Sequence, residues 1–251
     1  MAAVPLIQVN PEASLQRKQI SGDAFCIVVD DFLMDPDALL EFASQKSGDF
    51  SNSNANYPGV QLRISNEAID DIYRFVRSRM SKVYGFMRGQ IEILSSLAMA
   101  TLPPDELHFM QRLCHIDQDW EPNRAHYACV LYLFHDQRLG GTSFFRWKAK
   151  DIVWKALEIL RNDAGEAEEF LKKQFPTFRE PPRYMTESNE IADLLCTLSP
   201  RFNRLVFYPG DIPHSGALTA PELLSDDPQK GRLMLNIFFS VLPKADPSKG
   251  N

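Results

Sequence analysis

Apolar and polar residues alternate along the chain with two distinct periods, which separate expected strands from expected helices. A β-branched apolar run over 24–33 predicts a strand, and the Asp-Pro pair at 35–36 marks the start of a following helix. Apolar residues three or four positions apart predict a second helix over 66–84. The segment 46–64 is rich in Ser, Asn, Gly and Pro, which favours a long surface loop.

The second half of the chain has the texture of a β protein, with short apolar runs that are broken by turn residues. Strands are predicted within 91–102, 106–117, 126–136, 142–147, 203–214 and 231–242. Gly140 and Gly141 lie between two of these runs and predict a hairpin-like connection. Helical periodicity returns within 149–199, with a short helix expected near 188–195, so we interpret this segment as a helical insertion.

This order of elements favours an α+β protein built around a sandwich or barrel, with flanking helices before the strands and a helical insert among them. The 251 residues are 44% hydrophobic and 24% charged, which is typical of a globular chain. Because no linker is evident, we predict one domain over 1–251.

Charge and cysteine usage exclude several classes of protein. The formal net charge of −6 argues against a nucleic-acid binder, which needs a basic face to neutralise phosphates. The four cysteines are scattered without a CxxC pair, which fits a reducing compartment better than a disulfide framework or a thiolate zinc site. No secretion signal and no long apolar stretch is evident, so a cytoplasmic protein without a membrane span is expected.

The most informative motif is His115-x-Asp117, within the string LCHIDQDW at 113–120. Side chains two apart on a strand point to the same face, so both residues can reach one metal ion. Two histidines and one carboxylate on one face of an octahedron are the ligands of non-haem Fe(II) oxygenases. His214 is the best candidate for the second histidine, because it follows an apolar strand and a Pro-Gly turn.

The other three histidines are poorer ligand candidates. His108 lies in a strand-like run, His126 begins one and His135 ends it in a turn. For these residues a hydrogen-bonded structural role is the expected one.

Several elements in order make the sequence resemble the Fe(II)/2-oxoglutarate-dependent dioxygenases, and within that superfamily the prolyl-hydroxylase-like branch. The resemblance covers 107–242 apart from the insertion, and the elements that carry it are His115, Asp117, Tyr132, Leu133, Gly140, Gly141, residues 201–207, His214 and Arg232. It implies a double-stranded β-helix, or jelly roll, whose mouth holds Fe(II) between His115, Asp117 and His214.

The resemblance also implies a co-substrate site. Arg232 matches the basic residue that binds the remote carboxylate of 2-oxoglutarate, a task for which the guanidinium fork is suited. Tyr132 matches a tyrosine that assists at the same carboxylate, with plain core packing as its alternative. The gap from His214 to Arg232 is longer than the usual one, and Arg124, Arg201 and Arg204 are the alternative basic residues.

The implied activity is oxidation by O2 with 2-oxoglutarate as co-substrate, which releases succinate and CO2. Because Asp117 is present where related halogenases carry a small residue, hydroxylation is favoured over halogenation. A peptide, a protein or an amino-acid-like molecule fits the acidic chain better than a nucleic acid as prime substrate. Two alternatives stay open: a catalytically silent jelly-roll binding module, and a cupin-type metal enzyme that does not use 2-oxoglutarate.

Overall fold

The computed structural model describes residues 7–52, 57–84, 89–117 and 123–243. The strands are β1 (Gln16–Ser21), β2 (Ala24–Val29), β3 (Gly59–Arg63), β4 (Gly89–Ala100), β5 (Ala125–Tyr132), β6 (Thr142–Trp147), β7 (Ala192–Leu198), β8 (Arg204–Pro209), β9 (His214–Gly216) and β10 (Arg232–Pro243). The α-helices are α1 (Pro36–Gln45), α2 (Asp70–Phe75), α3 (Ser81–Tyr84), α4 (Lys150–Leu160) and α5 (Ala164–Gln174).

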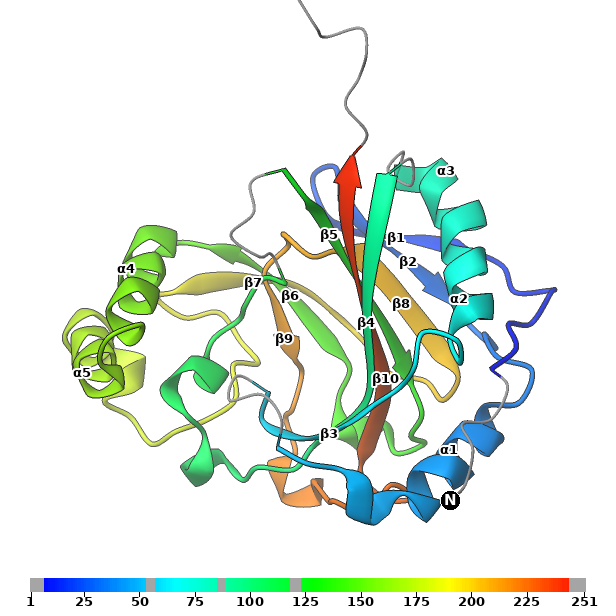
Figure 1. Ribbon diagram of the computed structural model, residues 1–251. Helices are drawn as coiled ribbons and strands as arrows, with labels where there is room; N and C mark the ends of the chain where they lie inside the picture. Colours follow the sequence, from blue (N-terminus) through cyan, green and yellow to red (C-terminus); the bar gives the residue numbers. More distant parts are fainter. Residues whose placement is uncertain (1–6, 53–56, 85–88, 118–122, 244–251) are drawn as a thin grey trace, which may run out of the picture.

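The strands form two antiparallel sheets that lie against each other (Figure 1). The larger sheet has the order β1-β2-β8-β5-β10-β4-β3, and the smaller sheet has the order β7-β6-β9. The long strand β10 pairs with β4 along its whole length and with β5 on its other side. This mostly antiparallel architecture with a few helices confirms the predicted α+β class.

Alternation along β10 gives the larger sheet two buried faces. Leu233, Leu235 and Ile237 point to one side, where they pack in the main core with residues of α1 and α2. Met234 points to the other side and packs with Phe144 of the smaller sheet. Each fully buried aliphatic side chain of this kind stabilises the fold by about 1.5–3 kcal/mol. The face that carries Met234 is the one that turns toward the candidate functional side chains described below.

The predicted N-terminal helices are present. Asp35 caps α1 by accepting a hydrogen bond from the backbone nitrogen of Ala38, and Pro36 occupies the first turn, as the sequence indicates. Residues 70–84 form the second helix, with a π-helical turn over Val76–Met80 between α2 and α3. None of the helices in the described ranges has the length and apolar content needed to cross a membrane.

The helical insertion differs from its prediction at its C-terminal end. Helices α4 and α5 pack on each other at the left edge of Figure 1, around Val153 and Leu171. The short helix expected near 188–195 is wrong, because strand β7 occupies Ala192–Leu198 and pairs with β6. Pairing with a neighbouring strand outweighs a weak local helical pattern.

The connection at Gly140 and Gly141 is not a hairpin. Strand β5 belongs to the larger sheet and β6 to the smaller one, so the chain crosses between the sheets here. Gly140 has φ +76°, a left-handed conformation that glycine adopts without a steric penalty. The glycine pair therefore turns the chain from one layer into the other.

Two further predictions from the sequence need correction. Part of the expected loop over 46–64 is strand β3, which pairs with β4 at the edge of the larger sheet. The expected strand over 106–117 is wrong: a 3-10 turn, Phe109–Arg112, capped by His108, lies in its middle, and the segment reaches a sheet only through a single bridge at His115. Pairing of a few residues with a sheet is therefore enough to fix the position of the His115-x-Asp117 motif.

Candidate metal centre

Backbone hydrogen bonds bring the three predicted ligands together from two distant segments. The backbone nitrogens of His115 and His214 each donate to the other residue's carbonyl oxygen, at 2.9 and 2.8 Å. Two residues further, the Asp117 backbone nitrogen donates to the Gly210 carbonyl oxygen at 2.8 Å. His115 and Asp117 thus flank the end of β9, and His214 is the first residue of that strand.

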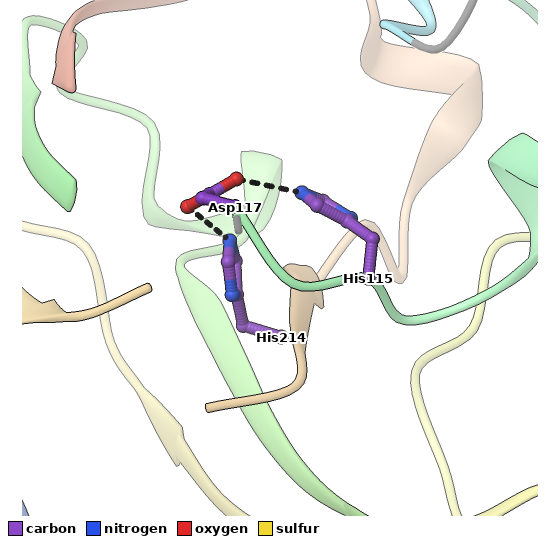
Figure 2. Close-up of side chains that lie close together, drawn as sticks. All are labelled: His115, Asp117 and His214. Carbon is purple, nitrogen blue, oxygen red and sulfur yellow. Dashed lines mark ion pairs between the residues drawn. The ribbon is translucent and has the colours of Figure 1, made fainter. Parts of the chain in front are cut away.

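The three side chains converge on one point, as Figure 2 shows. Asp117 Oδ1 lies 3.6 Å from His115 Nε2, and Asp117 Oδ2 lies 3.2 Å from His214 Nε2. One ligand atom from each residue lies within 4.8 Å of the other two. This spacing allows all three to bind a single ion.

The His214 ring is held in place by its surroundings. Its Nδ1 atom lies 2.9 Å from the carbonyl oxygen of Ile212, which turns Nε2 toward Asp117. A fixed hydrogen bond at one ring nitrogen is the usual way in which a protein orients a metal-binding histidine. The rings of Tyr208 and Phe144 stand beside it, with centroids 4.8 and 6.4 Å from the His214 ring.

Exposure differs among the three side chains. The His214 side chain is 6% exposed and that of Asp117 is 12% exposed, whereas that of His115 is 58% exposed. Solvent or a ligand can therefore reach the cluster from the His115 side.

Electrostatics favour a charged carboxylate here. Burial alone would raise the pKa of Asp117, but the positive charge of His214 and its hydrogen bond to the carboxylate outweigh burial and lower that pKa. Burial alone would lower the pKa of His214, and Asp117 raises it instead. An ionised carboxylate between two imidazoles is a donor set that suits Fe(II) or another divalent first-row metal, and three ligands leave coordination positions open.

The predicted co-substrate residues Arg232 and Tyr132 lie together elsewhere on the face of the larger sheet that carries Met234. Arg232 is 3% exposed, and its Nε and Nη2 atoms donate to the carbonyl oxygens of Gly140 and Gly141 at 3.0 and 2.6 Å. The Tyr132 hydroxyl lies 2.7 Å from Thr142 Oγ1. Burial raises the pKa of Tyr132, so this hydroxyl stays protonated at neutral pH.

The alternative basic residues are engaged elsewhere. Arg204 binds Asp30 through two contacts of 2.6 and 3.0 Å, and Arg201 also reaches Asp30 at 3.4 Å. Arg124 forms an ion pair with Glu92 at 2.8 Å. Arg232 pairs instead with backbone carbonyl oxygens, and its role toward a co-substrate stays a prediction.

Two of the other three histidines have structural settings of the kind that the sequence predicts. His108 caps the 3-10 turn before the motif, and the ring of His135 stacks on Phe202 with centroids 4.0 Å apart. His126 is different: its Nε2 atom is buried and has no hydrogen-bond partner.

A family model that matches residues 11–239 identifies the chain's relatives. The chain belongs to a family of unknown function (DUF6445). The matched residues include the three candidate metal ligands together with Tyr132 and Arg232, so all five predicted site residues lie within the part of the chain that the family model matches. No curated protein matches the chain.

Two solved structures are similar to this one at low identity. One is titled as prolyl 4-hydroxylases from Phytophthora capsici, at 13% identity and a TM-score of 0.46, covering 90% of this chain and 62% of the other. The other is apo HygX from Streptomyces hygroscopicus, at 10% identity and a TM-score of 0.41, covering 88% and 83%. This chain thus spans less than two thirds of the first structure, and the roles proposed below rest on its own side chains.

Sequence reasoning missed two tyrosines near these residues. Tyr208 lies in electrostatic reach of both Asp117 and Arg232, and burial raises its pKa well above the ordinary value. Tyr208 lies on the strand that leads to Gly210 and His214, two residues before Gly210. This position is the signal in the sequence that could have revealed it. Tyr57, whose buried hydroxyl has no hydrogen-bond partner, comes from the predicted loop and carried no such signal.

Two residues beyond the motif, Asp119 and Trp120, were candidates for contact with a substrate. They lie outside the described residues.

Proposed function

We propose that the protein is an Fe(II)- and 2-oxoglutarate-dependent oxygenase that hydroxylates a peptide, a protein or an amino-acid-like molecule. The observation that carries the proposal is the convergence of His115, Asp117 and His214, whose ligand atoms lie within 4.8 Å of one another. Such a histidine-carboxylate-histidine set with open positions is typical of non-haem iron oxygenases.

The topology supports a double-stranded β-helix as the scaffold. Successive strands β4 and β5 lie in the larger sheet and β6 and β7 in the smaller one, after which the chain changes sheet at each of β8, β9 and β10. His115 joins the smaller sheet through its bridge to His214. The cluster thus lies where the segment 115–117 meets the start of β9 and the turn at Gly210.

Each residue has a defined task in this proposal. His115, Asp117 and His214 would hold the iron, and the Ile212 carbonyl keeps His214 Nε2 directed at it. Bound iron with 2-oxoglutarate and O2 supplies the oxidising chemistry that no side chain can provide. The buried rings of Tyr208 and Phe144 exclude water from the inner side of the site.

Arg232 and Tyr132 are the proposed partners of the remote carboxylate of 2-oxoglutarate. The carbonyl oxygens of Gly140 and Gly141 fix the guanidinium through Nε and Nη2. Nη1 donates to the sulfur of Met234, a weak acceptor, and a carboxylate oxygen in its place would form a stronger, charge-assisted hydrogen bond. The Tyr132 hydroxyl stays protonated and can donate to the same oxygen.

A second candidate, a metal enzyme that does not use 2-oxoglutarate, is favoured by one observation. Two of the three guanidinium nitrogens of Arg232 already donate to backbone carbonyls. In this case Arg232 would have a structural role only.

Titration of the metal-free protein with Mn(II), followed by 2-oxoglutarate, separates these candidates. The oxygenase is expected to bind 2-oxoglutarate only after the metal, and with Fe(II) and O2 it should convert labelled 2-oxoglutarate to succinate. His214→Ala should lose both binding steps, whereas His135→Ala is the matched control and should keep both. Metal binding without any 2-oxoglutarate binding would favour the second candidate, and no metal binding would leave a silent binding module.

A further inference from the structure

Tyr57 lies beside Arg232 although the two residues come from distant parts of the chain. Strand β4 has β3 on one side and β10 on the other, and its residue Ala100 pairs with the first residue of each, Gly59 and Arg232 (Figure 1). The Pro58 carbonyl oxygen accepts a hydrogen bond of 3.0 Å from the first backbone nitrogen after β4, so the chain before β3 follows β4 past its end. Tyr57 is therefore at the end of the sheet where β10 begins, with its hydroxyl in electrostatic reach of the Arg232 guanidinium.

The Tyr57 hydroxyl is buried and has no hydrogen-bond partner. Two nearby tyrosines differ in this respect. The Tyr132 hydroxyl lies 2.7 Å from the Thr142 hydroxyl, and the Tyr184 hydroxyl donates to the Leu102 carbonyl oxygen at 2.7 Å. A phenylalanine at 57 would fill the same space without an unpaired polar atom, and buried polar atoms in native proteins are nearly always paired. The hydroxyl therefore indicates a partner that the chain itself does not supply.

The chemistry of the two side chains requires that partner to be an acceptor. Burial raises the pKa of Tyr57 to about 12, so its hydroxyl is protonated at neutral pH and can donate a hydrogen bond. The guanidinium of Arg232 carries five N–H donors and no acceptor. One acceptor placed between the two side chains can therefore serve both.

The charge of Arg232 favours an anion as this acceptor. The side chain is buried, and the partners of its three nitrogens are neutral: the carbonyl oxygens of Gly140 and Gly141 and the sulfur of Met234. A buried charge without an opposite charge costs free energy, and an anion beside it offsets that cost. A carboxylate oxygen can accept from the guanidinium and from the phenol at once, in charge-assisted hydrogen bonds.

Met234 covers the guanidinium atom that such an anion would reach. Its sulfur lies 3.0 Å from Arg232 Nη1. A methionine side chain is unbranched and has three rotatable bonds, so it adapts to a ligand more easily than a branched side chain. The thioether can therefore move aside when a carboxylate binds to Nη1.

We propose that Tyr57 is a carboxylate-binding residue, whose hydroxyl donates to the carboxylate that Arg232 Nη1 binds. This carboxylate is held by Tyr57 from the β3 side and by Tyr132 from the β5 side. Its assignment as the remote carboxylate of 2-oxoglutarate rests on the proposed function, whereas carboxylate binding at Arg232 does not. Two phenols around one guanidinium select a dicarboxylate over an acid with an apolar end.

Calorimetric titration of the Mn(II)-loaded, full-length protein with two 2-oxo acids tests this role. The first is 2-oxoglutarate, and the second is 2-oxopentanoate, which has the same chain length but ends in a methyl group instead of the remote carboxylate. Tyr57→Phe should weaken binding of 2-oxoglutarate by about 10- to 100-fold, because a hydrogen bond to a charged group is lost. It should leave binding of 2-oxopentanoate unchanged.

Tyr184→Phe is the matched control, because the Tyr184 hydroxyl already donates to Leu102. This variant should bind both acids as the wild type does. Urea denaturation of the ligand-free proteins gives a second readout. Tyr57→Phe should be at least as stable as the wild type, since no hydrogen bond is lost, whereas Tyr184→Phe should be less stable.

Three results would overturn the role of Tyr57 and leave the proposed function standing. They are an unchanged affinity of Tyr57→Phe for 2-oxoglutarate, an equal weakening of both acids, and a loss of stability in ligand-free Tyr57→Phe. If the wild type binds no metal, titration with glutarate decides. Glutarate binding that Tyr57→Phe weakens would support the carboxylate position and refute the oxygenase, and no glutarate binding would overturn both.

Discussion

Arg232 Nη2 donates a hydrogen bond of 2.6 Å to the backbone carbonyl oxygen of Gly141, and so joins the last strand of the larger sheet to the start of β6 in the smaller one. The neighbouring bond from Nε to Gly140 makes the connection two-pronged. The residue predicted to bind the co-substrate thus also holds the two layers together.

Arg232→Leu is expected to destabilise the protein because it leaves the carbonyl oxygens of Gly140 and Gly141 buried and unpaired. Loss of hydrogen bonds to a buried charged group costs about 1.5–3 kcal/mol each, so chemical denaturation should show a loss of several kcal/mol. Arg232→Lys keeps a charged donor group, although without the planar fork of the guanidinium, and should recover part of that loss. Equal stability of Arg232→Leu and the wild type would contradict the structural role.

Gly140→Ala is expected to destabilise the protein by about 2–4 kcal/mol, from backbone strain and overpacking together. The positive φ of Gly140 disfavours any side chain, and a Cβ there would collide with the carbonyl oxygen of Ala217. Gly48→Ala is the matched control, because a Cβ at Gly48 meets nothing within 4 Å. Thermal unfolding of the two variants should differ clearly; similar midpoints would show that the layer crossing tolerates a side chain.

The two histidines of the metal cluster should differ in what their loss does to the fold. His115→Ala and His214→Ala are each expected to weaken Mn(II) binding by more than about 100-fold. Loss of a residue that only supports a ligand already weakens metal binding by up to about 100-fold, and loss of the ligand itself should weaken it more. Without metal, His115→Ala should change stability by no more than about 0.5 kcal/mol, because that side chain is 58% exposed.

His214→Ala should in addition destabilise the metal-free protein by about 1–3 kcal/mol, because the part-buried Ile212 carbonyl loses its partner. Calorimetric titration and urea denaturation of both variants check this contrast. Metal binding retained by either variant would contradict the ligand assignment.

Much of the β texture could be predicted because strand periodicity is local. The alternation along β10 and β4 marks both strands without knowledge of their partners. The crossing at Gly140 could not be predicted, since two strands joined by a short glycine turn look alike whether they pair with each other or enter different sheets. Strand β7 was missed for a similar reason, because only its pairing with β6 makes it extended.

The metal cluster was accessible to sequence reasoning because the His-x-Asp spacing fixes two ligands at once. The predicted strand that was to carry them is absent, yet one bridge to His214 and one hydrogen bond to Gly210 achieve the same convergence. The position of His126 beside Asp117 could not be predicted, because it depends on the register of β5 against β8. Register across a sheet is set by packing that a single sequence does not display.

Acid stability should depend on the ion pair between Asp30 and Arg204, which joins the end of β2 to β8. Arg204 donates to both carboxylate oxygens, at 2.6 and 3.0 Å, and these hydrogen bonds lower the pKa of Asp30. A lowered folded-state pKa contributes stability that is fully present above the unfolded value of about 3.9 and is lost as the pH falls through the folded value. Asp30→Asn should therefore flatten the decline in the free energy of unfolding below about pH 4. The exposed Asp23→Asn serves as its control, and urea denaturation across the acid range should show an unchanged decline for that variant; the same decline in Asp30→Asn would contradict the role of this pair.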